Sequence, residues 1–364
     1  RGVLGGRDSD SVPIEYEYRL TGKEIFLAGI ANSHALISVA VLFGILSGIY
    51  GYLDDFAGIL NFDMGSAAAD AASHVFGPLA GSRAIIIVIV FIVLIVFLIG
   101  YVMAVVSKFI AFGGFVIQKR GDRIEVQRGL LARKSSSIVT HRVQTVNVSQ
   151  GLLMRLLGYA EVRAETASAL ATQNNNQKAQ LEDSVIHPFI KLKNLDGFLA
   201  GVLPEFTDRP RELAPLTLRA LRRSVTRYGV WSLIILGVPV VVIHHFEKLP
   251  GYVFAIAAAL WILMLVCGAL KWKGRAIGRT ERTLAMRRGA VRRQVVYLKK
   301  PKIQHATKEV NPFQHAAKMA TFSVYTAAAQ GKRNAIKDLT TAAADDYLAW
   351  TEPGRKKIAI SPEI

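Results

Sequence analysis

The chain has 364 residues, of which 51% are apolar and 20% are charged, and its formal net charge is +18. This length would ordinarily suggest about two or three domains. The apolar and charged residues are sharply segregated, however, which is typical of a membrane protein with soluble portions. The single cysteine, Cys267, excludes an intrachain disulfide and is expected to be a small buried apolar residue.

The chain starts with Arg1 rather than Met, so we expect that an upstream part was removed or left out. Residues 25–112 are predicted to form a transmembrane hairpin. Its two spans, residues 35–53 and 84–106, carry no charge and approach the ~20 residues that cross a bilayer. Both spans are internal, so neither is a signal peptide.

The predicted spans contain no ionisable side chain, and such groups are costly in a membrane and usually functional. This disfavours a transporter or a channel, unless partner chains supply a polar lining. Gly44, Gly48 and Gly51 instead give the first span a face of small residues suited to close helix packing. The loop of residues 54–83 has four aspartates and one arginine, so it is expected to lie outside the cell.

Residues 113–205 are predicted to form a β-rich module. Stretches with period-two or β-branched character are separated by glycines, which is typical of short strands. The stretch QGLLMRLLG, residues 150–158, has apolar residues at helical spacing and a terminal glycine, so it predicts a short helix or turn between strands. An amphipathic helix is expected to close the module.

A basic connector, residues 206–227, is predicted to lead into a second transmembrane hairpin, residues 228–271. The spans of this hairpin are residues 228–243 and 252–270. The first of them is short and contains Pro239, which is expected to kink it, and a buried helix of a soluble domain is the alternative. Lys and Arg residues flank the other ends of the spans, which predicts that both β-rich modules lie in the cytoplasm.

The second module, residues 272–351, repeats the first, and residues 352–364 form a tail. The stretch RGLLARKSSSIVTHRVQTVNVSQ (128–150) aligns without a gap with RGAVRRQVVYLKKPKIQHATKEV (288–310), at an offset of 160 residues. Repetition at a fixed spacing indicates a repeated structural unit. We therefore predict an α+β membrane protein with two repeats of a transmembrane helical hairpin followed by a small β-barrel or sandwich with a C-terminal helix.

The Gly-Leu-Leu turn, the basic-x-Gln strand and the RLLG step of the first module resemble the bacterial pleckstrin-homology (PH) domain, also called the membrane-flanking domain. The second module keeps Gly289 and the KIQ of residues 302–304 but has HAAK, residues 315–318, in place of the step. PIEYEYRLTGKEIFLAGIANS, residues 13–33, is similar to the connector between units in YdbT-like proteins. Those proteins typically carry three hairpin-and-module units. The resemblance therefore implies a PH-like fold in a bacterial inner membrane protein, a missing first unit, and a connector from that unit at residues 1–24.

The same resemblance implies a partner, a smaller YdbS-like membrane protein with one hairpin and one PH-like module. Some such pairs are associated with resistance to antimicrobial peptides. The function that follows is a non-enzymatic, membrane-anchored scaffold in envelope protection, and the alternative is a protein that binds or moves anionic membrane lipids. The number of copies in a homo- or hetero-oligomer stays open.

Two sets of residues are candidates for binding a lipid or a partner. In one set, Arg142 and Gln144, with their counterparts Lys302 and Gln304, are expected to share a strand face. The alternative is a fold signature in which the glutamine satisfies backbone groups. The other set follows the fourth span, where cations either contact anionic headgroups or only fix the topology. It consists of Lys271, Trp272, Lys273 and Arg275.

The sequence lacks the motifs of common enzymes, with no Gly-rich phosphate loop, no His-Glu-x-x-His and no nucleophile elbow. His244 and His245 are adjacent and would project differently from a helix, so a polar turn at the membrane surface is expected rather than a metal pair. The basic segments lack the interleaved aromatic residues of a nucleic-acid-binding surface. We therefore predict no catalysis, cofactor, metal or nucleic acid.

Overall fold

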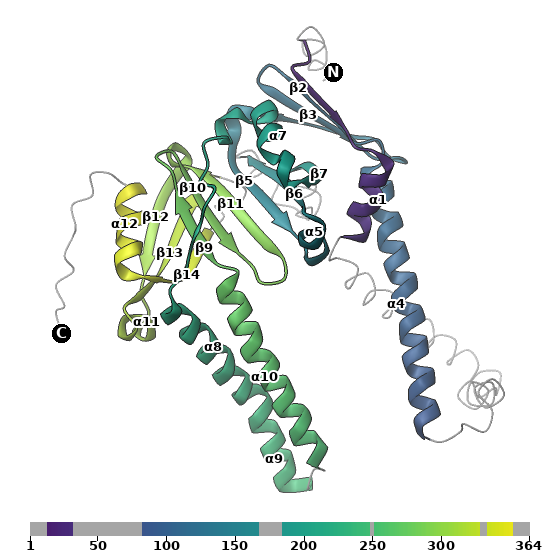
Figure 1. Ribbon diagram of the computed structural model, residues 1–364, viewed down its shortest axis with the longest axis vertical. Coiled ribbons are helices and arrows are strands. Elements are labelled where there is room, and N and C mark those ends of the chain that lie inside the picture. The colour runs from purple at the N-terminus through teal and green to yellow at the C-terminus, as the bar shows by residue number, and fades with distance from the viewer. Residues whose placement is uncertain (1–12, 32–81, 167–183, 248–250, 328–332, 352–364) are drawn as a thin grey trace, which may run out of the picture. The chain divides into compact units, whose positions relative to one another are not determined.

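The computed structural model describes five stretches of the chain (Figure 1). They are residues 13–31, 82–166, 184–247, 251–327 and 333–351. The predicted first span, with Gly44, Gly48 and Gly51, and most of the predicted outer loop lie outside these stretches. The chain divides into a smaller unit, which holds residues 20–115 and 128–134, and a larger unit with all the others.

Two described helices of the smaller unit pack against each other. They are α1 (Gly22–Ile30) and α4 (Ser82–Phe112). Helix α1 begins at a capping box, in which Thr21 and Glu24 each accept a hydrogen bond from the other's backbone N–H. A Cβ atom added to Gly29 would lie 3.1 Å from the side chain of Val105, so the glycine allows the two helices to approach closely. Helix α4 contains the predicted span 84–106 and meets the length and composition of a membrane span.

The first β-rich module has a four-stranded sheet and three further strands. The four-stranded sheet has the order β1 (Tyr16–Arg19), β2 (Val116–Arg120), β3 (Arg123–Arg128) and β4 (Lys134–Val139). The further elements are β5 (Val143–Gln150), α5 (Leu152–Leu157), β6 (Tyr159–Thr166), β7 (Val185–Lys191) and the closing helix α7 (Leu195–Val202). Both groups of strands bury large side chains, such as Ile117 and Ile186, and α7 buries Phe198 and Leu199, so the helix closes an apolar core.

The second module has the same plan. Its first strands are β8 (Ala214–Pro215), β9 (Ala276–Arg279), β10 (Thr283–Arg288) and β11 (Arg293–Lys299). They are followed by β12 (Ile303–Glu309), α11 (Pro312–Ala316), β13 (Met319–Thr326), β14 (Arg333–Thr340) and α12 (Thr341–Thr351). Leu284 of β10, Phe322 of β13 and Ala344 of α12 belong to one buried cluster, so both sheets and the closing helix share a core.

The two modules repeat each other element by element, at the predicted offset from β2 to β6 and from β9 to β13 and at a shorter spacing for the last strand and the closing helix. The strands β6 and β13, for example, begin at Tyr159 and Met319 and both have eight residues. Gly129 and Gly289 precede equivalent strands with φ angles of +106° and +99°. This left-handed backbone region strongly favours glycine, which explains why this residue is kept in both copies. The internal repeat and the mixed α+β character are thus confirmed.

The backbone conformation of the RLLG step is also kept in the second module, although its residues differ. Helix α5 ends at Gly158, which has the left-handed φ angle of +72° that commonly ends a helix. Lys318 occupies the same place after α11 and adopts a φ angle of +52°. The backbone of the step therefore tolerates a residue other than glycine.

One continuous sheet joins the two modules. The strands β5 and β11 pair antiparallel, with Gln150 opposite Arg293 and Thr145 opposite Leu298. The result is a seven-stranded sheet in the order β7-β6-β5-β11-β10-β9-β8 (Figure 1). Because β6 and β11 flank β5 on its two sides, all eight residues of β5 are buried.

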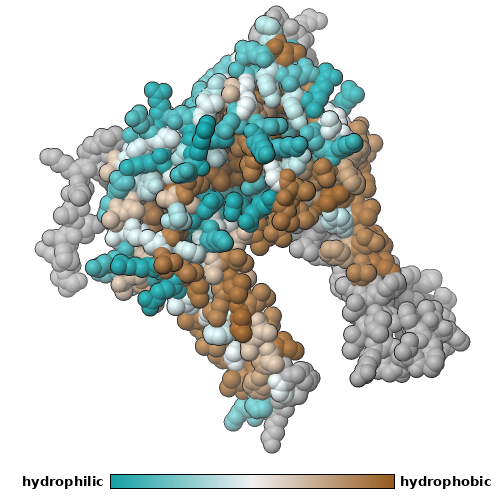
Figure 2. Space-filling model, in the orientation of Figure 1, coloured by the Kyte–Doolittle hydropathy of each residue, from teal (hydrophilic) through white to brown (hydrophobic). Residues whose placement is uncertain are grey.

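Two long apolar helical segments of the larger unit lie side by side. One is formed by α8 (Leu218–Ser232), a π-helical stretch (Leu233–Gly237) and α9 (Val238–Glu247), and the other is α10 (Gly251–Lys273). Both qualify as membrane spans, and much of their visible surface is hydrophobic (Figure 2). The π-helical stretch directly precedes the turn with Pro239, where a proline disturbs regular hydrogen bonding. A Cβ atom added to Gly268 would lie 3.2 Å from the Ser224 carbonyl oxygen, so glycine allows close packing of the two segments. The Gly268 carbonyl also accepts a hydrogen bond from the Ser224 hydroxyl at 2.8 Å.

The order of elements differs from the prediction in one respect. A hairpin followed by a module was expected, but the first strand of each module precedes the helices in the chain. Strand β1, within predicted connector 1–24, pairs with β2, and β8, within predicted connector 206–227, pairs with β9. The helices are therefore insertions between the first and second strands of each module. Strand β8 was missed because it has only two residues, whereas β1 does alternate but was assigned to a connector through the family resemblance.

Candidate membrane-proximal site

A buried carboxylate lies where the helices α8 and α10 meet the second module. The side chain of Asp338, in β14, is 0% exposed, and its backbone has a φ angle of +65°. Three guanidinium groups surround it. They belong to Arg223 at 2.8 Å, Arg275 at 3.2 Å and Arg227 at 3.6 Å. Removing a carboxylate from water is costly unless opposite charges compensate it, and here they do.

The arginines also bind other groups of the module. Arg223 donates to the carbonyl of Phe313 and, at 3.2 Å, to Oδ1 of Asn311. Arg275 donates to the carbonyl of Lys337 at 3.4 Å. Burial lowers the pKa of Arg275, and the nearby Asp338 carboxylate opposes that change. Because these arginines come from α8 and from the residues after α10, the cluster fixes both helices to β14.

Of the predicted residues after the fourth span, Trp272 and Arg275 contact the second module, whereas Lys271 and Lys273 are exposed. Trp272 donates from its indole to the carbonyls of Leu216 and Thr217, at 3.2 and 3.0 Å, and packs on the module core. Arg275 belongs to the Asp338 cluster. Lys271 lies over the ring of Tyr228, 4.8 Å from its centroid, and contacts its hydroxyl. Lys271 and Lys273 are exposed, so they are the members of this set that a headgroup can reach directly.

The basic-x-Gln feature does not place its two side chains on one strand face. Arg142 ends a 3-10 turn, Thr140–Arg142, and is exposed, whereas Gln144 is buried in β5. The Gln144 side chain donates to the carbonyl of Arg142 at 3.3 Å, which fits the alternative of a fold signature. The turn was not recognisable because Thr140–Arg142 continues the alternating pattern of the neighbouring strands.

Its counterpart in the second module contacts the first module. Lys302 donates to the carbonyl of His141 at 2.7 Å, across the junction of β5 and β11. Gln304, by contrast, is exposed on β12. Lys302 therefore helps to hold the two modules together.

Three arginines gather at the junction of the modules. Arg155 of α5 donates to the carbonyl of Ala290 at 3.1 Å, in the turn between β10 and β11. Arg287 and Arg293 lie on these two strands, and the register places them diagonally on one face. Their Nε atoms are buried and have no hydrogen-bond partner within the described part of the chain. Burial lowers the pKa of both, and the charge of Arg155 lowers them further, so an anion would be stabilised here.

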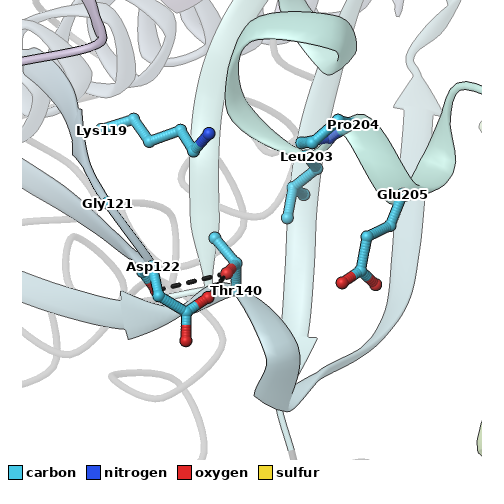
Figure 3. Close-up of a pocket in the computed structure, with 7 residues that line it drawn as sticks. All are labelled: Lys119, Gly121, Asp122, Thr140, Leu203, Pro204 and Glu205. Atoms are coloured by element: carbon cyan, nitrogen blue, oxygen red, sulfur yellow. Dashed lines mark hydrogen bonds between the residues drawn. The ribbon is translucent and has the colours of Figure 1, made fainter.

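A small hollow lies in the first module. It has a volume of about 210 Å³ and is lined by Lys119, Gly121, Asp122, Thr140, Leu203, Pro204 and Glu205 (Figure 3). Its polar groups already have partners, since Asp122 contacts Thr140 and His141, and Lys119 pairs with Glu15 at 2.7 Å. Among the described residues there is no group of His, Cys, Asp and Glu that could hold a metal.

Asp338, which pairs with arginines from α8 and from the residues after α10, was not singled out from the sequence. From the sequence, Arg223 and Arg227 were expected only as part of the basic connector, and Arg275 was a candidate for binding a lipid or a partner. One clue to Asp338 was present in the sequence. It lies in a stretch otherwise suited to a buried strand, and the basic residues at the start of α8 could compensate its charge.

The Bacterial PH domain family matches residues 68–203 and 224–351, so the chain belongs to this family and holds two copies of its domain. A curated relative is the transmembrane protein YdbT of Bacillus subtilis (strain 168), which is 22% identical over 326 residues. The match covers 86% of this chain and 61% of YdbT, so the chain spans about three fifths of the length of that relative. No solved structure matches the chain. The molecule is a membrane-associated protein with two bacterial PH domains.

Proposed function

We propose that this chain is a non-enzymatic, membrane-anchored scaffold that assembles with a smaller PH-domain membrane protein in envelope protection, including resistance to antimicrobial peptides. Two transmembrane hairpins, one inserted in each module, would anchor it in the bacterial inner membrane. The modules then lie in the cytoplasm, because each apolar helix carries positive residues near its own module end and positive charge is retained inside. These residues include Lys108, Arg219, Arg222 and Lys273.

The continuous seven-stranded sheet is the observation that carries this proposal. Pairing of β5 with β11 turns two modules into one extended body, and the contacts of Lys302 with His141 and of Arg292 with Ser149 reinforce the junction. The Asp338 cluster in turn fixes the second module to its helices. A continuous sheet whose second module is fixed to its own apolar helices suits assembly rather than turnover of a substrate.

Co-purification and a deletion strain test the proposal together. The tagged chain, extracted from native membranes in mild detergent, is expected to retain a smaller membrane protein with one bacterial PH domain. Deletion of the gene is expected to increase sensitivity to cationic antimicrobial peptides, and the wild-type gene should restore resistance. Recovery of the chain alone, together with unchanged sensitivity of the deletion strain, would overturn the proposal.

Binding of anionic lipid is a second candidate function, and the three arginines at the module junction favour it. Within the described part of the chain, no ion pair with a carboxylate is formed by Arg155, Arg287 or Arg293. The phosphate of a phosphatidylglycerol headgroup is an acceptor that suits guanidinium groups.

This second candidate is tested with the full chain in neutral detergent micelles. Added phosphatidylglycerol is expected to raise the melting temperature of the wild type, and the double variant Arg287→Gln, Arg293→Gln should lose most of this increase. Lys273→Gln measures how much the exposed lysines at the end of α10 contribute to the increase. Arg211→Gln, which changes another exposed cation, is the matched control. Inorganic phosphate serves as the other ligand, since an equal increase with phosphate would indicate a general anion site. If the double variant were stabilised by phosphatidylglycerol as much as the wild type, the module junction would be excluded as the lipid-binding site.

A further inference from the structure

The strands β5 and β12 hold the same place in their modules but have different surroundings. Strand β5 has a partner on each side, and all eight of its residues are buried. Strand β12 pairs with β13 and ends the three-stranded sheet. Of its seven residues only Ala306 is buried. Within the described part of the chain, one side of β12 therefore has no neighbouring strand.

The strands β11 and β4 differ in the complementary way. Strand β11 pairs with β10 on one side and with β5 on the other, and it buries Val296, Tyr297 and Leu298. Strand β4 is the last strand of its sheet among the described residues, and only Ile138 of its six residues is buried. An edge strand offers a row of backbone N–H and C=O groups on which another strand can pair.

We propose that β12 of one copy of this chain pairs with β4 of a second copy, antiparallel and in the register that joins β5 to β11. Both edges occur in the same chain, and the repeat relates each to a strand that already pairs in this way. In β5 and β11, the opposite residues include Ser149 with Gln294, Asn147 with Val296 and Val146 with Tyr297. The offset of 160 converts them into Glu309 with Lys134, Thr307 with Ser136 and Ala306 with Ser137.

The residues that become opposite are chemically compatible. Glu309 and Lys134 carry opposite charges, which favours a directly opposed pair in a sheet. The hydroxyl of Thr307 is buried without a hydrogen-bond partner among the described residues, and the hydroxyl of Ser136 would lie opposite it. Small residues elsewhere in β4 leave room for the side chains of β12.

The same relation gives a role to Arg142. Lys302 of the second module donates to the carbonyl of His141 in the first module at 2.7 Å. The repeat counterparts of these two residues are Arg142 and Pro301. In the proposed pair, the exposed Arg142 of one copy would donate to the Pro301 carbonyl of the next. Because every copy contributes two different edges, the contact is head-to-tail and generates rows of copies.

Cysteine cross-linking in membranes tests the register. In a Cys267→Ala background, the full chain with Ser136→Cys and Thr307→Cys is expected to form disulfide-linked dimers and larger species upon mild oxidation. The matched control combines Ser136→Cys with Lys308→Cys, since residue 308 faces the other side of the strand and should give few dimers. A second control, Asn147→Cys with Val296→Cys, should form a disulfide within one chain. Its formation without any dimer from the test pair would overturn the proposal.

Substitution of Arg142 provides a test that needs no oxidation. Arg142→Ala is expected to weaken self-association several-fold in detergent, measured by light scattering across protein concentrations, whereas Arg142→Lys should retain it. Equal association of all three proteins would contradict the proposed role of Arg142. Cross-linking of Thr307→Cys to a different protein, with no dimer of this chain, would assign the edge to another partner and overturn the choice of a second copy.

Discussion

The two PH modules share a backbone plan but differ in how much of it is covered. Strand β5 of the first module carries five polar residues, and every one is buried because β11 covers them. Its counterpart β12 has similarly polar residues that remain largely accessible. The same strand can therefore be an interior or an edge, depending on which module follows it. The burial of a strand in this protein depends on its position relative to the other module as much as on its residue composition.

The modules also differ in the charged group that each one buries. The second module buries Asp338 one residue before Leu339, the strand partner of Ala320. The first module has Phe189 at that place, one residue before the partner of Ala160. Conversely, His187 of the first module corresponds to Ile336 of the second, since they pair with Val162 and Phe322 respectively. Each module thus has a buried polar group that the other replaces with an apolar one.

Substitution of Asp338 is expected to have the largest effect. Asp338→Ala leaves three arginines without their shared carboxylate, and removal of one partner of a buried ion pair costs about 3–5 kcal/mol. All four tryptophans lie between residues 228 and 351, so tryptophan fluorescence during unfolding in detergent reports on this half of the chain. Asp346→Ala, which removes an exposed partner of Arg279, is the control and should cost at most about 1 kcal/mol. Similar losses for the two variants would contradict the central role of Asp338.

Exchange of residues between β5 and β12 tests the difference in burial directly. Val148 corresponds to Lys308, and it is buried between Val162 and Val295. Val148→Lys places an amine there, so we expect a loss of unfolding free energy on the order of 3 kcal/mol, measured by circular dichroism.

The reverse exchange, Lys308→Val, is the matched control. It removes a partly exposed ion pair with Asp345 at 2.6 Å, so the loss should be below about 1 kcal/mol. Equal costs of the two exchanges would show that the strands have similar surroundings after all.

His187 is expected to make the first module sensitive to acid. Burial lowers its pKa to about 3, below the value of about 6.5 in an unfolded chain. Between these values the unfolded state binds a proton that the folded state does not, so stability falls as the pH falls from 6.5 towards 3. The loss is up to about 1.4 kcal/mol per pH unit.

The matched variant His187→Ile introduces the residue that the second module carries at this place. Unfolding curves at pH 7 and pH 5 should show a smaller decrease for this variant than for the wild type. Comparison of the two pH dependences cancels any general cost of the substitution. Parallel pH dependences would mean that His187 is not buried in the neutral form.

Much of the fold could be predicted because it is local or repeated. Hydropathy predicted three of the apolar helices. Aligned residues such as Gly129 and Gly289 indicated the repeat at 160 residues and the family. The pairing of β5 with β11 could not be predicted, since strand partners distant in sequence leave no mark in a single chain. For the same reason Arg275 was expected at a headgroup rather than beside Asp338, whose burial depends on how α8 packs.

The smallest expected effect concerns the turn that the two modules build from different residues. Gly158 and Lys318 both have a left-handed φ angle, and a side chain in that region costs about 1 kcal/mol or more. Lys318→Gly should therefore stabilise the protein by about 1 kcal/mol, and Gly158→Ala should destabilise it by about as much, although nothing lies near its added Cβ. Gly197→Ala, inside helix α7, should instead be stabilising. If thermal unfolding gave both glycine-to-alanine changes the same sign, backbone conformation would not be what separates the two turns.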